Sequence, residues 1–502
     1  MSRHRTSVWQ SAMRFAVLTS LICLAGPCVF NAGHAFANSP TRPNVVIIFI
    51  DDMGYGDVGF NGATEPQTPH LDRMAREGMR FTDFYVGCAV CSGSRTSLLT
   101  GCHYQRLSMP PVLFPNSDRG LHPSEVTIAD MLRDAGYRTA CIGKWHLGHL
   151  HPCLPTDQGF DEYWGIPYSN DMWIDPANTL AENLRVRSGL TREVVSAGHK
   201  LKNAVPILSG DEVVEYPADQ RTLTRRYTEK AIEFMHRDDP DGRPFFVYLP
   251  HTMVHLPLAV SEAFDDPNQS LITNAIEEVD WSVGQVLESL RNSEASRNTL
   301  VIFTSDNGAA VGSSLPLRAR KGSVYDGGIR EPTLMWWPGA IPAGGDCSEV
   351  AATIDVLPTL AGLCGGSLPK RQIDGHDIWP LMSGQAGAKS PHDAYVLMHG
   401  PGAVRSGRWK FYPWREGTKK QRGDQVKPKD ASEYPVQLYD VVADIGERNN
   451  VAMQHPEVVQ RMAAVYEAHV DEIEKNRRPT APLQRPEGSL SAERPRPAAK
   501  RK

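Results

Sequence analysis

The chain has 502 residues, of which 41% are hydrophobic and 22% are charged, a composition typical of a globular protein with one extensive core and a smaller second domain. Its formal charge of −5 is unevenly distributed: residues 1–37 carry +3, residues 476–502 carry +6, and the body between them carries about −14. An acidic body argues against nucleic acid as a substrate, and no run in the sequence is apolar over the length that a membrane span needs.

The first 37 residues are typical of a cleavable export signal. Three arginines accompany an apolar run at residues 15–26, and Ala35-Phe36-Ala37 fits a small-x-small cleavage site. The apolar run is too short to cross a bilayer comfortably, so we expect a secreted or periplasmic protein without a membrane span. Seven of the nine cysteines follow this segment, and they could pair outside the cytoplasm, although spacing defines no pairing.

Short, continuous apolar runs alternate with helical stretches from residue 45 to residue 304. The runs are residues 45–50, 139–143, 245–249 and 300–304, and the helical stretches are residues 124–135, 222–236 and 274–291. Continuous hydrophobicity is typical of strands that are buried on both faces of a sheet. The alternation predicts an α/β domain over residues 38–384, with a large, mostly parallel sheet sandwiched by helices.

The pattern changes after residue 385. Short strand-like runs at residues 394–398, 402–405, 409–412 and 437–440 are followed by a helical stretch at residues 456–474. They predict a smaller C-terminal α+β lobe with an antiparallel sheet over residues 385–475. The remaining residues, 476–502, are basic and rich in proline, and we expect them to be disordered.

Polar residues stand where two of the predicted strands end. Asp51 and Asp52 follow one strand, and Asp306 and Asn307 follow another. In open α/β sheets the ligand site lies off the carboxyl ends of the strands, so these residues have a geometric reason to converge. An all-oxygen ligand set suits Ca²⁺ or Mg²⁺ better than Zn²⁺, although a single Asp-Asp pair is more often a helix cap or a solvated turn.

The other two predicted strands are also followed by residues that can bind an anion. Lys144 and His146 come after residues 139–143, and His255 comes after residues 245–249. Taken alone, a Lys-x-His loop is more often surface than site, and a lone cysteine such as Cys91 is more often a buried thiol.

Several motifs, spread along the chain, suggest a common function for these residues. Val90-Cys91-Ser92-Gly93-Ser94-Arg95, followed by Leu99-Thr100-Gly101, resembles the signature of the type I sulfatases, formylglycine-dependent members of the alkaline phosphatase superfamily. The other segments that resemble motifs of this family contain Asp51 and Asp52, Lys144 and His146 in a G-K-W-H-L-G loop, Ser169 in a G-I-P-Y-S stretch, His255 in H-x-P, Asp306 and Asn307, and Lys321 in a K-G segment ahead of G-G-I-R-E-P. One departure is Gly93, which stands where the family usually has proline.

The resemblance implies a chemistry for each position. Cys91 is oxidised after synthesis by a formylglycine-generating maturation enzyme, and the hydrated aldehyde becomes the nucleophile. One divalent cation, Ca²⁺ or Mg²⁺, is held by Asp51, Asp52, Asp306, Asn307 and the oxidised Cys91. The resemblance further implies that Arg95 orients the nucleophile and that the sulfate is bound by Lys144, Ser169, His255 and Lys321. It also implies that His255 protonates the leaving oxygen. His146 would then take the proton from the second hydroxyl, so that sulfate leaves.

The function that we expect is hydrolysis of sulfate monoesters, either simple aryl sulfates or sulfated carbohydrates. One alternative is a phosphate or phosphonate monoester hydrolase of the same superfamily. Another is a non-catalytic protein that binds sulfated glycans, if Gly93 leaves Cys91 unmodified. The sequence does not define the position of the sulfate on the substrate, the choice between Ca²⁺ and Mg²⁺, or the oligomeric state.

Overall fold

The computed structural model describes residues 42–199, 201–400, 402–413 and 436–487. The expected signal peptide, residues 1–37, lies outside the described residues, and so do residues 488–502 of the expected tail. No helix in the described part of the chain combines the length and the hydropathy that crossing a membrane requires.

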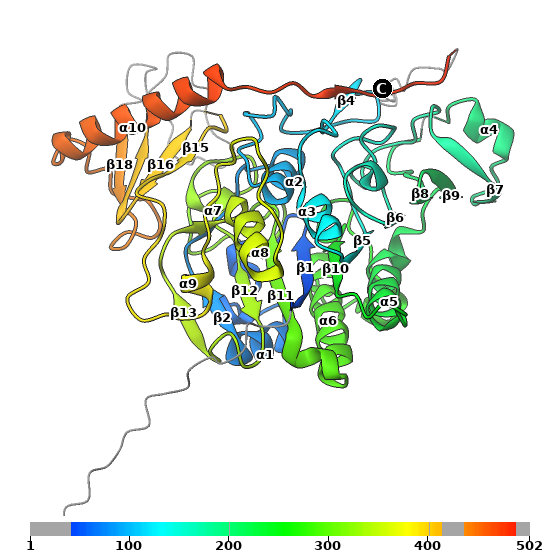
Figure 1. Cartoon of the computed structure of the whole chain (residues 1–502), viewed down its shortest axis with the longest axis horizontal. Coiled ribbons are helices and arrows are strands. Elements are labelled where there is room, and N and C mark those ends of the chain that lie inside the picture. The colour runs from blue at the N-terminus through cyan, green and yellow to red at the C-terminus, as the bar shows by residue number, and fades with distance from the viewer. Residues whose placement is uncertain (1–41, 200, 401, 414–435, 488–502) are drawn as a thin grey trace, which may run out of the picture. The chain divides into compact units, whose positions relative to one another are not determined.

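The described residues form one large mixed sheet and a separate small antiparallel sheet (Figure 1). In spatial order the large sheet contains β13 (Gly345–Cys347), β2 (Met79–Phe81), β12 (Thr333–Trp336), β11 (Thr299–Ser305), β1 (Asn44–Ile50), β10 (Phe245–Pro250), β5 (Arg138–Ile142), β6 (Glu162–Gly165), β8 (Ile207–Ser209), β9 (Glu212–Tyr216) and β7 (Thr179–Val186). Its central strands β11, β1, β10, β5 and β6 are all parallel. All four strands that the apolar runs predict lie in this parallel block.

Helices cover both faces of the large sheet because its central strands are apolar on both sides. Val45, Ile47 and Phe49 of β1 belong to a core cluster that also contains residues of α2, α3 and α8. The alternate residues 46, 48 and 50 belong to a second cluster, with residues of α1, α5 and α6. The helices are α1 (Pro69–Glu77), α2 (Cys91–Thr100), α3 (Ile128–Asp134), α4 (Arg192–Ser196), α5 (Leu223–His236), α6 (Leu271–Arg291), α7 (Asp326–Ile329), α8 (Val356–Cys364), α9 (Trp379–Met382) and α10 (Pro456–Lys475). The expected helix-covered sheet is confirmed.

The predicted C-terminal α+β element is confirmed as well. Its antiparallel sheet consists of β15 (Tyr395–Leu397), β16 (Ala403–Ser406), β17 (Trp409–Tyr412) and β18 (Gln437–Asp440), and α10 packs against β16 and β17. Lys410 of β17 is fully buried and forms an ion pair with Asp326 of α7. Buried charges therefore join this sheet to the first residue of α7.

The prediction of disorder from residue 476 is wrong for residues 476–487. In this segment β19 (Ala481–Pro482) pairs with β4 (Arg119–Gly120). Elsewhere in the chain, the short strands β3 (Phe84–Tyr85) and β14 (Ala351–Ala352) pair with each other. Arg478 and Arg485 form ion pairs with Glu125 and Asp175. Composition predicted a solvated basic tail, but these arginines neutralise carboxylates on the body of the protein.

The seven cysteines that the structure describes are all buried and unpaired.

Candidate active site

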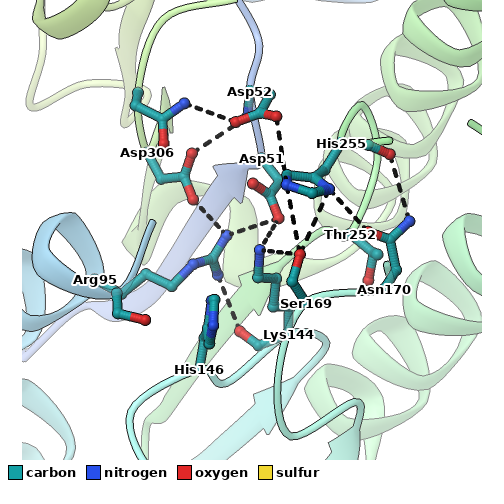
Figure 2. A network of polar contacts seen from close by, with 12 residues as sticks. Asp51, Asp52, Arg95, Lys144, His146, Ser169, Asn170, Thr252, His255 and Asp306 are labelled. Atoms are coloured by element: carbon teal, nitrogen blue, oxygen red, sulfur yellow. Dashed lines mark hydrogen bonds and ion pairs between the residues drawn. The ribbon is translucent and has the colours of Figure 1, made fainter. Parts of the chain in front are cut away.

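The candidate site lies at the carboxyl edge of the large sheet. Asp51 and Asp52 follow β1, and Asp306 follows β11, whose Ser305 is in register with Ile50. Because the two strands are parallel neighbours, their ends deliver these carboxylates to one place, where all three are at most 1% exposed. Figure 2 shows the carboxylates facing one another beside Arg95 and Lys144.

Helix α2 brings Cys91 to the same place. Cys91 is its first residue, is 3% exposed, and places its sulfur within 4.8 Å of a carboxylate oxygen of both Asp51 and Asp306. Burial raises the pKa of this thiol, while Lys144 and Lys321 oppose the shift. The N-terminus of a helix favours negative charge, so an anionic oxygen at residue 91 would be stabilised there.

Arg95, one turn further along α2, holds the carboxylates in position. Its Nη2 lies 2.7 Å from Asp306 Oδ2 and 3.4 Å from Asp51 Oδ2, and its Nη1 donates to the Lys144 carbonyl at 2.9 Å. All four side chains are fully buried. Arg95 therefore ties α2 to the ends of three strands.

The predicted metal ligands fit a divalent cation. Asp51 Oδ1 and Asn307 Oδ1 are buried and have no hydrogen-bond partner among the described residues. Burial raises the pKa of Asp306 to about 7, and the nearby Asp51 adds to this shift while Arg95 and Lys144 oppose it. Asn307 Nδ2 donates to Asp52 Oδ1 at 2.7 Å, which leaves its amide oxygen free to act as a ligand.

Two lysines bring positive charge to the site. Lys144 Nζ contacts Asp51 Oδ2 and lies 3.2 Å from Ser169 Oγ, while Lys321 Nζ lies 2.5 Å from Asp52 Oδ1. Burial lowers the pKa of Lys321, but Asp52, the thiol of residue 91 and two further carboxylates outweigh burial and raise it above its usual value, so the side chain stays charged. Both lysines and the carboxylates of Asp51 and Asp306 act electrostatically on residue 91, and the lysines could bind the oxygens of a sulfate ester there.

His255 presents one ring nitrogen to this group. Its Nδ1 lies 2.6 Å from the Leu256 carbonyl and 3.0 Å from Asn170 Oδ1, and since both are acceptors, Nδ1 carries a proton. Its Nε2 lies 3.5 Å from Ser169 Oγ and 3.7 Å from Asp52 Oδ2. Nε2 is therefore the atom that can exchange a proton with a ligand in the site (Figure 2).

His146 is held in a defined tautomer. Its Nε2 lies 2.8 Å from the Leu113 carbonyl, an acceptor only, so Nε2 carries the proton and Nδ1 has a lone pair. Nδ1 is buried and has no hydrogen-bond partner in the described part of the chain. Burial and the neighbouring Lys144 hold the pKa of His146 well below 6.5, so the ring is a neutral base.

Two site residues have left-handed backbone conformations. Asp52 has φ +65° and His146 has φ +67°. Such angles cost about 1–3 kcal/mol in a residue with a side chain and are concentrated at functional sites, where the surrounding contacts enforce them.

Every sequence-predicted site residue lies in this one group, but sequence reasoning missed two positioning contacts. Asn170 follows Ser169 directly and holds His255, so extending the Ser169 segment by one residue would have found it. The Leu113 carbonyl is a backbone group, and no side-chain pattern identifies it.

Gly93, the departure from the motif, has a packing explanation in the folded protein. A Cβ at this position would lie 2.7 Å from Cys88 Sγ and 2.8 Å from Cys88 Cβ. The Gly93 N–H also donates to the Pro111 carbonyl at 3.1 Å, a bond that proline could not make. Cys88 occupies the space that a larger residue 93 would need.

We expect Gly93→Ala to destabilise the protein by about 1–2 kcal/mol. Overpacking costs about 1–3 kcal/mol, which exceeds the helix-propensity gain of about 0.5–1 kcal/mol for alanine over glycine. The measurement is denaturant unfolding of the variant against the natural chain. The control is the same substitution beside Cys88→Gly, which removes the two closest atoms and leaves only Tyr104 Cδ1, at 3.1 Å, so Gly93→Ala should be clearly less destabilising there. Equal destabilisation in both backgrounds would contradict the explanation.

Comparison with known proteins gives one consistent result. The family model described as Sulfatase matches residues 43–366. Arylsulfatase A of Homo sapiens is 36% identical over 461 residues, covering 86% of this chain and 88% of its own length. N-acetylgalactosamine-6-sulfatase of Canis lupus familiaris is 34% identical, covering 76% of this chain and 74% of its own. The crystal structure of Ps i-CgsB in complex with k-i-k-neocarrahexaose is 26% identical, has a TM-score of 0.71, and covers 87% of this chain and 94% of that chain.

Proposed function

The chain belongs to the sulfatase family and is a sulfuric ester hydrolase, and on this premise we propose that it acts through a formylglycine made from Cys91, with one divalent cation. The observation that carries the proposal is the convergence of Cys91 with the carboxylates of Asp51 and Asp306, from two neighbouring strand ends, beside two lysines. A buried thiol in an apolar core would have no reason to lie among three carboxylates and two cations.

The residues of the chain divide the work of sulfate-ester cleavage. Asp51, Asp52, Asp306 and Asn307 would hold the cation, which would supply positive charge to offset the charge of the sulfate and of the nucleophile. Addition of water to the formylglycine aldehyde gives two hydroxyl groups on one carbon. One attacks sulfur as the S–O bond to the leaving group breaks, and loss of the proton from the other re-forms the aldehyde and breaks the C–O bond to sulfate. Arg95 keeps the carboxylates aligned with the start of α2.

Binding and proton transfer fall to the remaining residues. Lys144 and Lys321 bind and orient the sulfate oxygens, and Ser169 Oγ adds a hydrogen bond. His255 donates a proton from Nε2 to the departing oxygen, with Asn170 fixing its ring. His146 accepts a proton at Nδ1 in the release step.

We further propose that the substrate is a sulfated carbohydrate and that the protein is exported. The support for a carbohydrate substrate comes from two similar proteins whose names state a carbohydrate: the N-acetylgalactosamine-6-sulfatase and the structure that contains neocarrahexaose. The support for export comes from the signal-like sequence of residues 1–37.

Mass spectrometry of the peptide that contains Cys91, from protein made in its native host, tests the proposal. A mass that matches the aldehyde supports the formylglycine mechanism, and an intact thiol contradicts it. A second assay compares the sulfate and phosphate esters of one phenol. A higher kcat/KM for the phosphate ester would favour a phosphate or phosphonate monoester hydrolase.

The position of His146 leads to a prediction about pH. A base acts in its neutral form, so its activity is present above its pKa and is lost as the pH falls through it. Because burial and Lys144 hold the pKa of His146 well below 6.5, we expect kcat to be retained on acidification to well below pH 6.5. The measurement is kcat against pH at saturating substrate. The low-pH decline assigned to His146 should be absent from the residual activity of His146→Gln, and a decline centred at or above pH 6.5 in the natural chain would contradict the assignment.

A further inference from the structure

The segment after α10, residues 476–487, lies against the loops of residues 115–120, 150–153 and 175–177, and we call it the C-terminal strap. Figure 1 shows it in red beside β4, with which its strand β19 pairs. The Leu483 N–H donates to the Asp118 carbonyl at 2.9 Å, and the Gln484 N–H donates to the His151 carbonyl at 2.7 Å. Ala481 and Leu483 are buried in a small apolar cluster with Leu150, Cys153 and Ala177. The strap is therefore a docked part of the protein.

Arg485 is the residue of the strap that joins two of these loops. Its Nη2 lies 2.9 Å from Asp175 Oδ2 and its Nη1 lies 3.1 Å from Asp175 Oδ1, a bidentate pair with a fully buried carboxylate. The same Nη2 donates to the carbonyls of Pro115 at 3.4 Å and Ser117 at 3.3 Å. One guanidinium thus contacts the loop of residues 113–117 and the loop that contains Asp175.

The first of these loops determines which nitrogen of His146 is the base. Leu113 supplies the carbonyl that accepts the proton of His146 Nε2. The loop is held from one side by α2, because the Leu113 N–H donates to Ser92 Oγ at 3.0 Å. Arg485 holds it from the other side. If the Leu113 carbonyl moved away, nothing in the described contacts of His146 would keep the Nδ1 lone pair free.

The second loop contacts the segment that follows His146 in the chain. Asp175 Oδ2 lies 2.6 Å from Nε2 of His149, which is three residues beyond His146, and both side chains are buried. Burial raises the pKa of Asp175, but His149 and Arg485 outweigh burial and lower it, so the carboxylate stays ionised. Arg485 therefore contacts the loop of residues 113–117 through carbonyl groups, and through its ion pair with Asp175 it is linked to His149, in the segment that follows His146.

We propose that Arg485 is a positioning residue for sulfate release: it holds the Leu113 carbonyl and the His149 segment so that His146 presents Nδ1 as the proton acceptor. The inference rests on the function proposed above. It assigns a role in the reaction to a segment whose composition predicted disorder. The apolar cluster and the strand pairing keep the strap docked when Arg485 is changed, so its role can be separated from folding.

The test compares Arg485→Met with a matched change in the same strap. Arg485→Met keeps the length of the side chain and removes its donors. Arg478→Met is the control, because Arg478 also pairs with a buried carboxylate, that of Glu125. Its other side-chain hydrogen bonds go to Gln372 and Cys102, and among the described residues it forms no hydrogen bond or ion pair with residues 113–117. We expect Arg485→Met to lower kcat by about tenfold to a hundredfold with little change in KM, while Arg478→Met keeps the natural kcat.

A second readout does not depend on turnover. Amide hydrogen exchange of residues 113–117 should become faster in Arg485→Met and stay unchanged in Arg478→Met. Arg485→Lys retains the charge and should restore part of kcat. An unchanged kcat in Arg485→Met would overturn the proposal. So would an equal loss of kcat in both methionine variants that parallels their loss of thermal stability.

The same experiments separate this inference from the function on which it rests. If residue 91 of the active natural chain carries a thiol, the proposed function fails and the inference fails with it. If residue 91 carries the aldehyde while Arg485→Met turns over normally, only the positioning role of Arg485 is wrong.

Discussion

Replacing Cys91 by serine is expected to abolish turnover, with a loss of more than about 10³-fold, and to leave the fold intact. Serine is close to cysteine in size, and its hydroxyl would lie at the start of α2 among the same carboxylates and lysines. It can still attack a sulfate ester once. Because its carbon carries only one oxygen, the sulfated serine has no second hydroxyl to expel sulfate, and the enzyme remains blocked.

Peptide mass spectrometry after incubation with an aryl sulfate measures this outcome. We expect residue 91 of Cys91→Ser to gain the mass of one sulfuryl group, while Cys91→Ala, which has no nucleophile, gains none. The serine variant is also checked for an aldehyde, because oxidation of the serine by the host would recreate the natural group. Unmodified serine that turns over at the natural rate would show that the mechanism is wrong.

The second large effect is expected at the cation site. Asp306→Asn removes one negative charge from the group of Asp51, Asp52 and Asp306, and with it the carboxylate that Arg95 contacts at 2.7 Å. We expect kcat/KM at a fixed cation concentration to fall by more than about 10²-fold and to recover in part at excess Ca²⁺ or Mg²⁺. Removal of the cation from the natural chain by a chelator should abolish activity reversibly, and adding back each ion shows which one the site prefers.

Thermal unfolding gives a readout of cation binding without substrate. A ligand that binds only the folded state raises the melting temperature, so Ca²⁺ should stabilise the natural chain more than Asp306→Asn. The matched control is Asp346→Asn, which removes a carboxylate from an Asp–Arg pair at the surface, where Asp346 Oδ2 lies 2.6 Å from Arg80 Nη2. If Ca²⁺ raises the melting temperature of Asp306→Asn as much as that of Asp346→Asn, Asp306 is not a ligand.

The parts of the fold that sequence predicts are those with a local signal. Residues 45–50 are apolar without interruption, and the structure buries alternate side chains of this strand in two different clusters. Asp51 and Asp306 are far apart in the sequence, and their convergence was predictable because parallel strands end at one edge of a sheet.

The parts that sequence does not predict depend on contacts between distant segments. Arg485 pairs with Asp175, 310 residues away, and nothing in the composition of residues 476–502 separates a docked arginine from a solvated one. The tautomer of His146 depends on the Leu113 carbonyl, which every residue type provides. Gly93 is explained only when Cys88 is seen to fill the space beside it.

The burial of Cys91 has a consequence for the order of events during synthesis. With 3% of its surface exposed and α2 packed on all sides, residue 91 is beyond the reach of another enzyme once the protein has folded. Under the proposed mechanism, conversion of the thiol to formylglycine must therefore precede the packing of α2. Under the same proposal, protein that folds with the thiol intact could not be converted afterwards, so the amount of folded protein would not measure the fraction that carries the aldehyde.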